Sequence, residues 1–90
     1  MADTQLFVAR KEFVARVSND VIVQLLDDLL EDGVINDGEK DAMIEENGSR
    51  AERARHLIDI VRRKGPVTSE KLISRLWERD PNLCELLNLD

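Results

Sequence analysis

The sequence has 90 residues, of which 42% are apolar and 36% are charged, and its net charge at pH 7 is −6. A chain of this size supports one domain, expected to span residues 1–90, with one core and no deep substrate cavity. The acidic excess argues against nucleic acid as a partner, because phosphate binding needs basic residues. The single cysteine allows no internal disulfide, and no apolar run approaches the length of about 18–20 residues that spans a membrane. We therefore expect a cytoplasmic protein that begins at its natural N-terminus and binds no membrane.

The first predicted helix covers residues 3–17, and its apolar side chains spread over a wide arc. At roughly 100° per residue, Arg10 falls in the middle of that arc. A guanidinium group in this position must reach outward to water, or the helix must bend so that its two halves present different faces. We expect a bend near Arg10 and Lys11.

The stretch VIVQLLDDLLEDGVI, residues 21–35, predicts a strongly amphipathic helix around which the fold is organised. Apolar residues recur at helical spacing and form one face: Ile22, Leu25, Leu26 and Leu29. Carboxylates occupy the opposite side, where we expect them to be solvated: Asp27, Asp28 and Glu31. Ser18 or Asp20 is expected to cap the start of this helix, and Gly33 to end it.

Capping signals place the third and fourth helices. Asn36 is followed three residues later by Glu39, which predicts a capping box at the start of the third helix. Ser49 and Glu52 repeat that spacing at the start of the fourth helix, after a turn signal at Asn47-Gly48. The third helix is short and mostly charged. The buried face of the fourth helix is expected to contain Ala54, Leu57, Ile58 and Val61.

Two proline pairs mark the last helices. Gly65-Pro66 ends the fourth helix, and we expect Thr68 or Ser69 to cap the fifth. Asp80-Pro81 combines a capping residue with proline at the first position of a sixth helix. The apolar residues of these two helices are Leu72, Ile73, Leu76, Trp77, Leu83, Leu86, Leu87 and Leu89. Six helices with short connections and no strand-like alternation predict an all-α antiparallel bundle.

No pattern for catalysis, a metal or a cofactor survives inspection. His56 is the only histidine and Cys84 the only cysteine, so the chain lacks the ligands of a zinc site. Calcium-loop registers with Gly33 or Gly38 at the sixth position each place residues without side-chain oxygens at ligand positions. We therefore expect a non-enzymatic chain with no cofactor and no metal. An enzyme or metal protein remains the alternative that an activity screen and metal analysis would reveal.

Charges are sorted by helix. Acids concentrate in the second and third predicted helices, and bases in the first and fourth, which is more order than solubility requires. If the first and fourth helices are neighbours, their bases merge into one patch. We predict that the acidic face docks on the basic face of another copy or a relative. Such a contact is heterologous, and its repetition generates rings or open filaments. A helical scaffold without self-association is the plainer alternative.

Several segments together resemble a known family. They are LLDDLLEDGVIN at 25–36, EEN at 45–47, RARHLIDIV at 53–61, KG at 64–65 and ERDPNLCELLNL at 78–89. In order and spacing they resemble a caspase recruitment domain (CARD), a member of the death-domain superfamily, and most of all the N-terminal prodomain of an inflammatory caspase. The resemblance covers about Leu6 to Leu89. It implies a six-helix antiparallel Greek-key bundle with a bent first helix.

The resemblance also implies homotypic CARD–CARD assembly into oligomers or filaments, with acids of the second helix set against bases of the first and fourth. The expected protein-binding residues are Asp27, Asp28, Glu31, Arg10, Lys11, Arg53, Arg55 and Asp59. The implied partner is a CARD-containing adaptor or NOD-like sensor, and the implied output is proximity activation of an inflammatory caspase in inflammasome or apoptosis signalling. A protease domain, if the protein has one, would follow residue 90. The alternatives are the CARD of an adaptor or sensor, and a CARD-only decoy that caps such assemblies.

Overall fold

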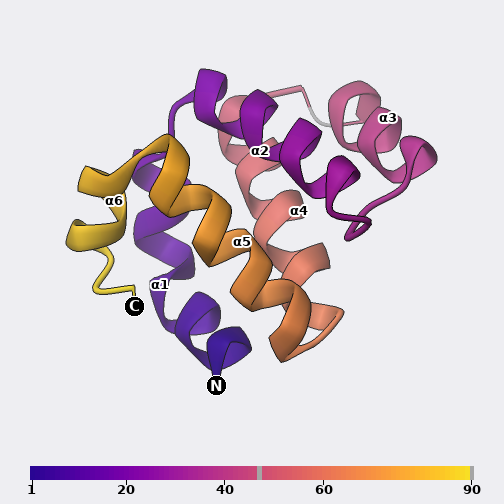
Figure 1. Ribbon diagram of the computed structural model, residues 1–90. Helices are drawn as coiled ribbons and strands as arrows, with labels where there is room; N and C mark the ends of the chain where they lie inside the picture. The colour runs from indigo at the N-terminus through magenta and orange to yellow at the C-terminus, as the bar shows by residue number, and fades with distance from the viewer. Residues whose placement is uncertain (47, 90) are drawn as a thin grey trace.

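The computed structural model describes residues 1–46 and 48–89, so the turn predicted at Asn47-Gly48 falls partly outside the described residues. This part of the chain contains six α-helices and no strand, which confirms the all-α prediction (Figure 1). The helices are α1 (Ala2–Arg16), α2 (Asn19–Glu31), α3 (Asp37–Glu46), α4 (Arg50–Arg63), α5 (Pro66–Arg79) and α6 (Pro81–Leu86). α5 packs against α1, α2, α4 and α6, and α1 also packs along α4. The bundle is therefore built around α5, and the expectation that the helix at residues 21–35, now α2, organises the fold is wrong.

Side-chain caps fix where four of the helices begin. Ser18, Ser49 and Asp80 each accept a hydrogen bond from the backbone N–H three residues later, at 3.1 Å in all three cases. The capping box at the start of α3 is complete, because Asn36 Oδ1 accepts the Glu39 N–H at 2.8 Å and Glu39 Oε1 accepts the Asn36 N–H at 3.0 Å. These contacts confirm the predicted starts of α3, α4 and α6, and they select Ser18 as the cap of α2.

The expected cap of α5 at Thr68 or Ser69 is wrong. The helix begins at Pro66, and the hydroxyl groups of Thr68 and Ser69 donate to the Gly65 carbonyl oxygen at 3.1 and 2.7 Å. Gly65 has a φ of 112°, which glycine adopts without a steric penalty. Pro66 then supplies the φ of the first helical residue and needs no hydrogen-bond acceptor for a backbone N–H. The glycine–proline pair therefore starts α5 as well as ending α4.

The core is assembled from the predicted apolar stripes. The α2 stripe of Ile22, Leu25, Leu26 and Leu29 is almost completely buried, which confirms that prediction. The apolar faces of α4 and α5 lie in the same core, apart from a half-buried Trp77. Leu57, Ile58, Leu72 and Leu76 are all fully buried. One contiguous core of this kind holds the charged outer faces of the helices in fixed positions.

α6 differs from the expected arrangement of its apolar residues. Leu86 is 62% exposed, whereas Cys84 is fully buried in the core. Burial, with a smaller contribution from the Asp80 charge, raises the pKa of the Cys84 thiol to about 11. A thiol with so high a pKa is almost entirely protonated near neutral pH, so Cys84 fills space in the core rather than acting as a nucleophile.

Candidate protein-interaction site

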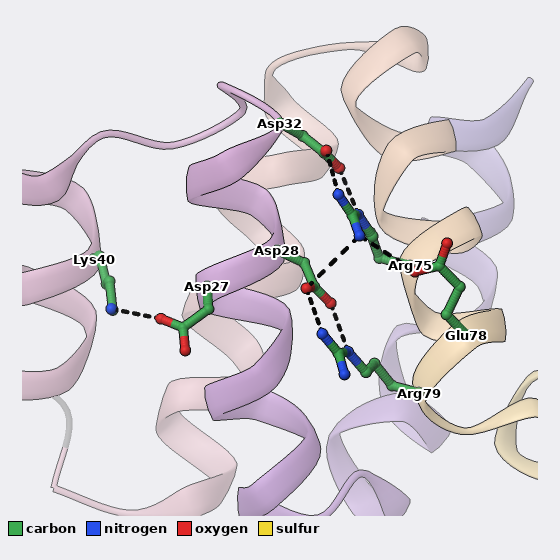
Figure 2. Close-up of polar contacts among 7 residues, drawn as sticks. All are labelled: Asp27, Asp28, Asp32, Lys40, Arg75, Glu78 and Arg79. Atoms are coloured by element: carbon green, nitrogen blue, oxygen red, sulfur yellow. Dashed lines mark hydrogen bonds and ion pairs between the residues drawn. The ribbon is translucent and has the colours of Figure 1, made fainter.

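The acidic face is formed by α2 and α3, which pack side by side. Asp27 and Glu31 are exposed and lie one turn apart on α2. Asp27 is not isolated, because its Oδ1 accepts a hydrogen bond from Lys40 Nζ of α3 at 2.6 Å (Figure 2). Further exposed acids on α3 are Asp37, Asp41, Glu45 and Glu46. The α2 anchors are accessible from solvent, and their role in docking stays a prediction.

Asp28 does not lie on this face, so the prediction that it is solvated is wrong. Its side chain is 4% exposed and points toward α5. Arg79 donates to both carboxylate oxygens, from Nε at 2.8 Å and from Nη2 at 2.6 Å. These hydrogen bonds outweigh the effect of burial and lower the pKa of Asp28 below its ordinary value. Because Asp28 is buried in this internal ion pair, we no longer include it in the candidate docking surface.

A second bidentate ion pair joins the same two helices. Arg75 of α5 donates to Asp32, just past the end of α2, from Nε at 2.8 Å and from Nη2 at 2.6 Å. Arg75 also approaches Asp28 at 3.8 Å and Glu78 at 3.3 Å, so the charges form one network (Figure 2). Bidentate arginine–carboxylate pairs are directional, which makes this network a clamp between α2 and α5. The clamp fixes the rotation of α2 and therefore the outward direction of Asp27.

The basic face lies where α1 packs along α4, and this confirms that the two helices are neighbours. Arg10, Lys11, Arg50 and Arg55 line one surface hollow of about 310 Å³ between them. Arg53 does not line the hollow and instead donates from Nη1 to Asn19 Oδ1 at 3.2 Å. Arg50 was not among the expected site residues, although it follows the Ser49 cap directly. It also donates to two carbonyl oxygens at the end of α1, which holds it at the edge of the hollow.

Arg10, which falls in the middle of the apolar arc of α1, extends its side chain outward to α4. It donates to Asp59 from Nε at 2.7 Å and from Nη2 at 2.9 Å. Its side chain remains 37% exposed, and the hydrogen bonds hold the pKa of Asp59 below its ordinary value. The helix around Arg10 is continuous, and the bend near Arg10 and Lys11 stays a prediction. Lys11 and Arg55, which are exposed, are the more available bases on this face.

The acidic and basic faces lie on different pairs of helices, although α3 also packs against α4. Figure 1 shows α1 and α3 on opposite sides of the bundle, with α2, α4 and α5 between them. Within residues 1–46 and 48–89, no group of three or more His, Cys, Asp and Glu side chains is arranged to hold a metal ion. None of the helices described by the structure is long and apolar enough to cross a membrane. What the arrangement offers is one acidic and one basic surface on a rigid body.

A small six-helix bundle with charged faces of opposite sign on two sides is a protein-interaction module. The caspase recruitment domain family model matches residues 7–90, and the chain belongs to this family. Its fold is accordingly that of the death-domain superfamily, as the resemblance implied. The fold is similar to that of the solution structure of ICEBERG, an inhibitor of interleukin-1β generation. That match has a TM-score of 0.79 and 40% sequence identity, and it covers 87% of this chain and 88% of the other.

Relatives of different lengths share this domain. Caspase-1 of Equus caballus is 40% identical over 89 residues, which cover 99% of this chain but only 22% of that protein. Human caspase recruitment domain-containing protein 18 is also 40% identical over 89 residues, which cover 99% of both chains. The sequence described here therefore spans about a fifth of the caspase-1 relatives and nearly the whole of a protein that contains little beyond the domain.

Proposed function

We propose that this chain is a homotypic recruitment module whose acidic α2–α3 face docks on the basic α1–α4 face of another CARD. The observation that carries the proposal is the gathering of Arg10, Lys11, Arg50 and Arg55 around one hollow, on a different side of the bundle from α3. Complementary charged surfaces speed the diffusional encounter of two molecules and fix their relative orientation. A single molecule presents both faces, so its acidic face can dock on one neighbour while its basic face receives another.

The expected contact pairs Asp27 and Glu31 of one molecule with Lys11 and Arg55 of the next. The Arg10–Asp59 pair supports the basic side, because it holds α1 against α4 while Arg10 stays partly exposed. Arg53, which donates to Asn19 outside the hollow, belongs to the same proposed side. The contact joins different surfaces and is heterologous, so its repetition extends an open helical filament unless the rotation closes a ring.

Recruitment through such a filament concentrates whatever is attached to the domain. Tethered effectors meet at an effective concentration on the order of millimolar, which replaces intrinsic affinity between them. The partner in this proposal is the CARD of an adaptor or a NOD-like sensor in the cytoplasm. The effector is an inflammatory caspase, whose protease domain would lie outside residues 1–90, and the signal belongs to inflammasome or apoptosis pathways.

The second candidate function is inhibitory. The relative that this chain covers almost from end to end contains little beyond the domain, and the ICEBERG structure is that of an inhibitor of interleukin-1β generation. A domain with one productive face and no attached effector would cap a growing assembly. Adding this chain at low ratio to a separately prepared caspase-1 CARD distinguishes the two roles. A recruiter lengthens the assemblies and enters them, whereas a decoy shortens them.

The proposal is tested by following self-association with light scattering as concentration rises. Charged surfaces are screened over about 8 Å at physiological ionic strength, so assembly should be faster at low salt and suppressed by added sodium chloride. Arg55→Asp should abolish it. Arg16→Asp is the matched control, because Arg16 is an exposed base on α1 that does not line the hollow. Scattering that rises with salt would instead indicate apolar aggregation through exposed side chains such as Val8.

A further inference from the structure

A lysine from a neighbouring helix covers the acidic anchor of the proposed docking surface. Lys40 Nζ lies 2.6 Å from Asp27 Oδ1, and the Asp27 side chain is still 60% exposed. The Lys40 side chain is only 26% exposed, so its stem is packed against the protein while its ammonium group reaches the carboxylate (Figure 2). The anchor is therefore accessible to a partner, but part of its charge is already neutralised.

The position of Lys40 is fixed by its neighbours along the chain. The capping box between Asn36 and Glu39 orders the first turn of α3. Lys64, just past the end of α4, donates to Glu39 at 3.0 Å and to the Val34 carbonyl oxygen at 2.8 Å, which ties this turn to the end of α4. Lys40 follows Glu39 directly, so its backbone is held over α2. An ammonium group presented from an ordered backbone loses less entropy on pairing than one on a free surface side chain.

We propose that Lys40 is an intramolecular competitor for Asp27, which an incoming partner must displace before docking. This inference rests on the proposed function, because it gives Asp27 the role of acidic anchor. In the free domain the Lys40–Asp27 pair lowers the attraction of the acidic face for bases. Docking exchanges that internal ion pair for an intermolecular one and leaves the Lys40 ammonium in water. The Lys40–Asp27 ion pair therefore raises the protein concentration at which the domain assembles.

The same geometry predicts which base the partner uses. Lys40 makes a point contact with one oxygen of Asp27, whereas an arginine can bond both carboxylate oxygens at once. Three arginines of this chain already bind an aspartate in that bidentate way, at Asp59, Asp32 and Asp28. An arginine therefore displaces Lys40 more effectively than a lysine does. The partner residue at Asp27 is accordingly an arginine, such as Arg55 of a second copy.

The test compares Lys40→Gln with Lys71→Gln by light scattering, in the parent chain and in an Asp27→Asn background. Both substitutions change the net charge by the same amount, but Lys71 lies on α5 beside the Asp32 carbonyl oxygen. Lys40→Gln should lower the threshold concentration for assembly by roughly two- to fivefold, the range expected for one exposed ion pair, with the Lys71 variant close to the parent. In the Asp27→Asn background the effect of Lys40→Gln should disappear, because the two residues act as a pair.

A second measurement uses the monomer and does not depend on assembly. Free arginine is titrated into the dilute protein while carbon NMR follows the Asp27 carboxyl group. Lys40→Gln should lower the arginine concentration at half-saturation by the same factor, and free lysine should bind more weakly than arginine. Equal titrations of the parent and Lys40→Gln, or weaker assembly of Lys40→Gln, overturn the inference. Assembly of Asp27→Arg that equals that of the parent contradicts the proposed function instead, whatever the titration gives.

Discussion

Two adjacent carboxylates, Asp27 and Asp28, have opposite roles in this fold. Asp27 is exposed and pairs with Lys40, whereas Asp28 is buried and bonded by Arg79. Asp28→Ala removes both hydrogen bonds and leaves the guanidinium of Arg79 without its carboxylate. We expect the free energy of unfolding to fall by about 1–3 kcal/mol, measured by urea denaturation.

Asp27→Ala is the matched control for this prediction, because it removes the same side chain one position earlier. It should change the free energy of unfolding by no more than about 0.5 kcal/mol, as surface substitutions usually do. Equal losses in the two variants would mean that the Asp28–Arg79 pair contributes nothing to folding in solution.

Helical spacing alone does not distinguish these two residues. Both fall outside the apolar stripe of α2, and Asp28 lies on the flank that α5 later covers. Its partner, Arg79, is 51 residues away in the sequence, so no local pattern predicts the ion pair. The stripe, by contrast, follows from periodicity within one helix, and Leu25, Leu26 and Leu29 are buried as expected. Local signals thus predict which residues enter the core, whereas the pairing of charges depends on how the helices pack and cannot be predicted from local sequence.

At the scale of helices, bidentate arginine–aspartate pairs hold α2 to α5 and α1 to α4. Hydrogen bonds from arginine lower the pKa of Asp28, Asp32 and Asp59 in the folded protein. Their contribution to stability is therefore fully present above the unfolded pKa of about 3.9 and is lost as the pH falls through the lowered folded values. We expect the free energy of unfolding to change little from pH 7 to about 5 and to fall steeply below about pH 4.

This prediction is checked by urea denaturation at a series of pH values. Asp59→Asn should be less stable than the parent at neutral pH and should show a smaller loss in acid, because one of the carboxylates with a lowered pKa is gone. The two curves should approach each other at low pH. Curves that stay parallel down to pH values near 2 would show that the Arg10–Asp59 pair does not link helix packing to protonation.

Helix boundaries were mostly predictable because capping is a local interaction. The starts of α3, α4 and α6 follow from a side chain that accepts a nearby N–H, at Asn36, Ser49 and Asp80. The start of α5 was missed because Gly65 caps it through its backbone conformation and offers no side chain to recognise. The expected neighbourhood of α1 and α4 was correct, but the hollow that unites their bases, with Arg50 at its edge, depends on three-dimensional packing.

At the scale of the whole molecule, the separation of charge predicts directed assembly. Deleting one exposed charge should do little, since an exposed ion pair is typically worth only about 0.2–1 kcal/mol. Reversing a charge places like charges across the interface, which can cost several kcal/mol and recurs at every subunit of a filament. Asp27→Arg and Arg55→Asp should therefore each abolish filaments while leaving the melting temperature nearly unchanged.

Mixing these two variants separates directed docking from a general effect of charge. The mutated acidic face of Asp27→Arg then meets the mutated basic face of Arg55→Asp with opposite charges. The unmutated acidic face of Arg55→Asp and the unmutated basic face of Asp27→Arg are complementary as well. Only contacts between two copies of the same variant oppose like charges. The mixture should therefore recover filaments in which the two variants alternate, whereas each variant alone stays monomeric. Sizing chromatography and negative-stain microscopy of the mixture measure this directly. If each variant alone polymerises like the parent, Asp27 and Arg55 are ordinary solvated residues, and the heterologous contact lies elsewhere on the bundle.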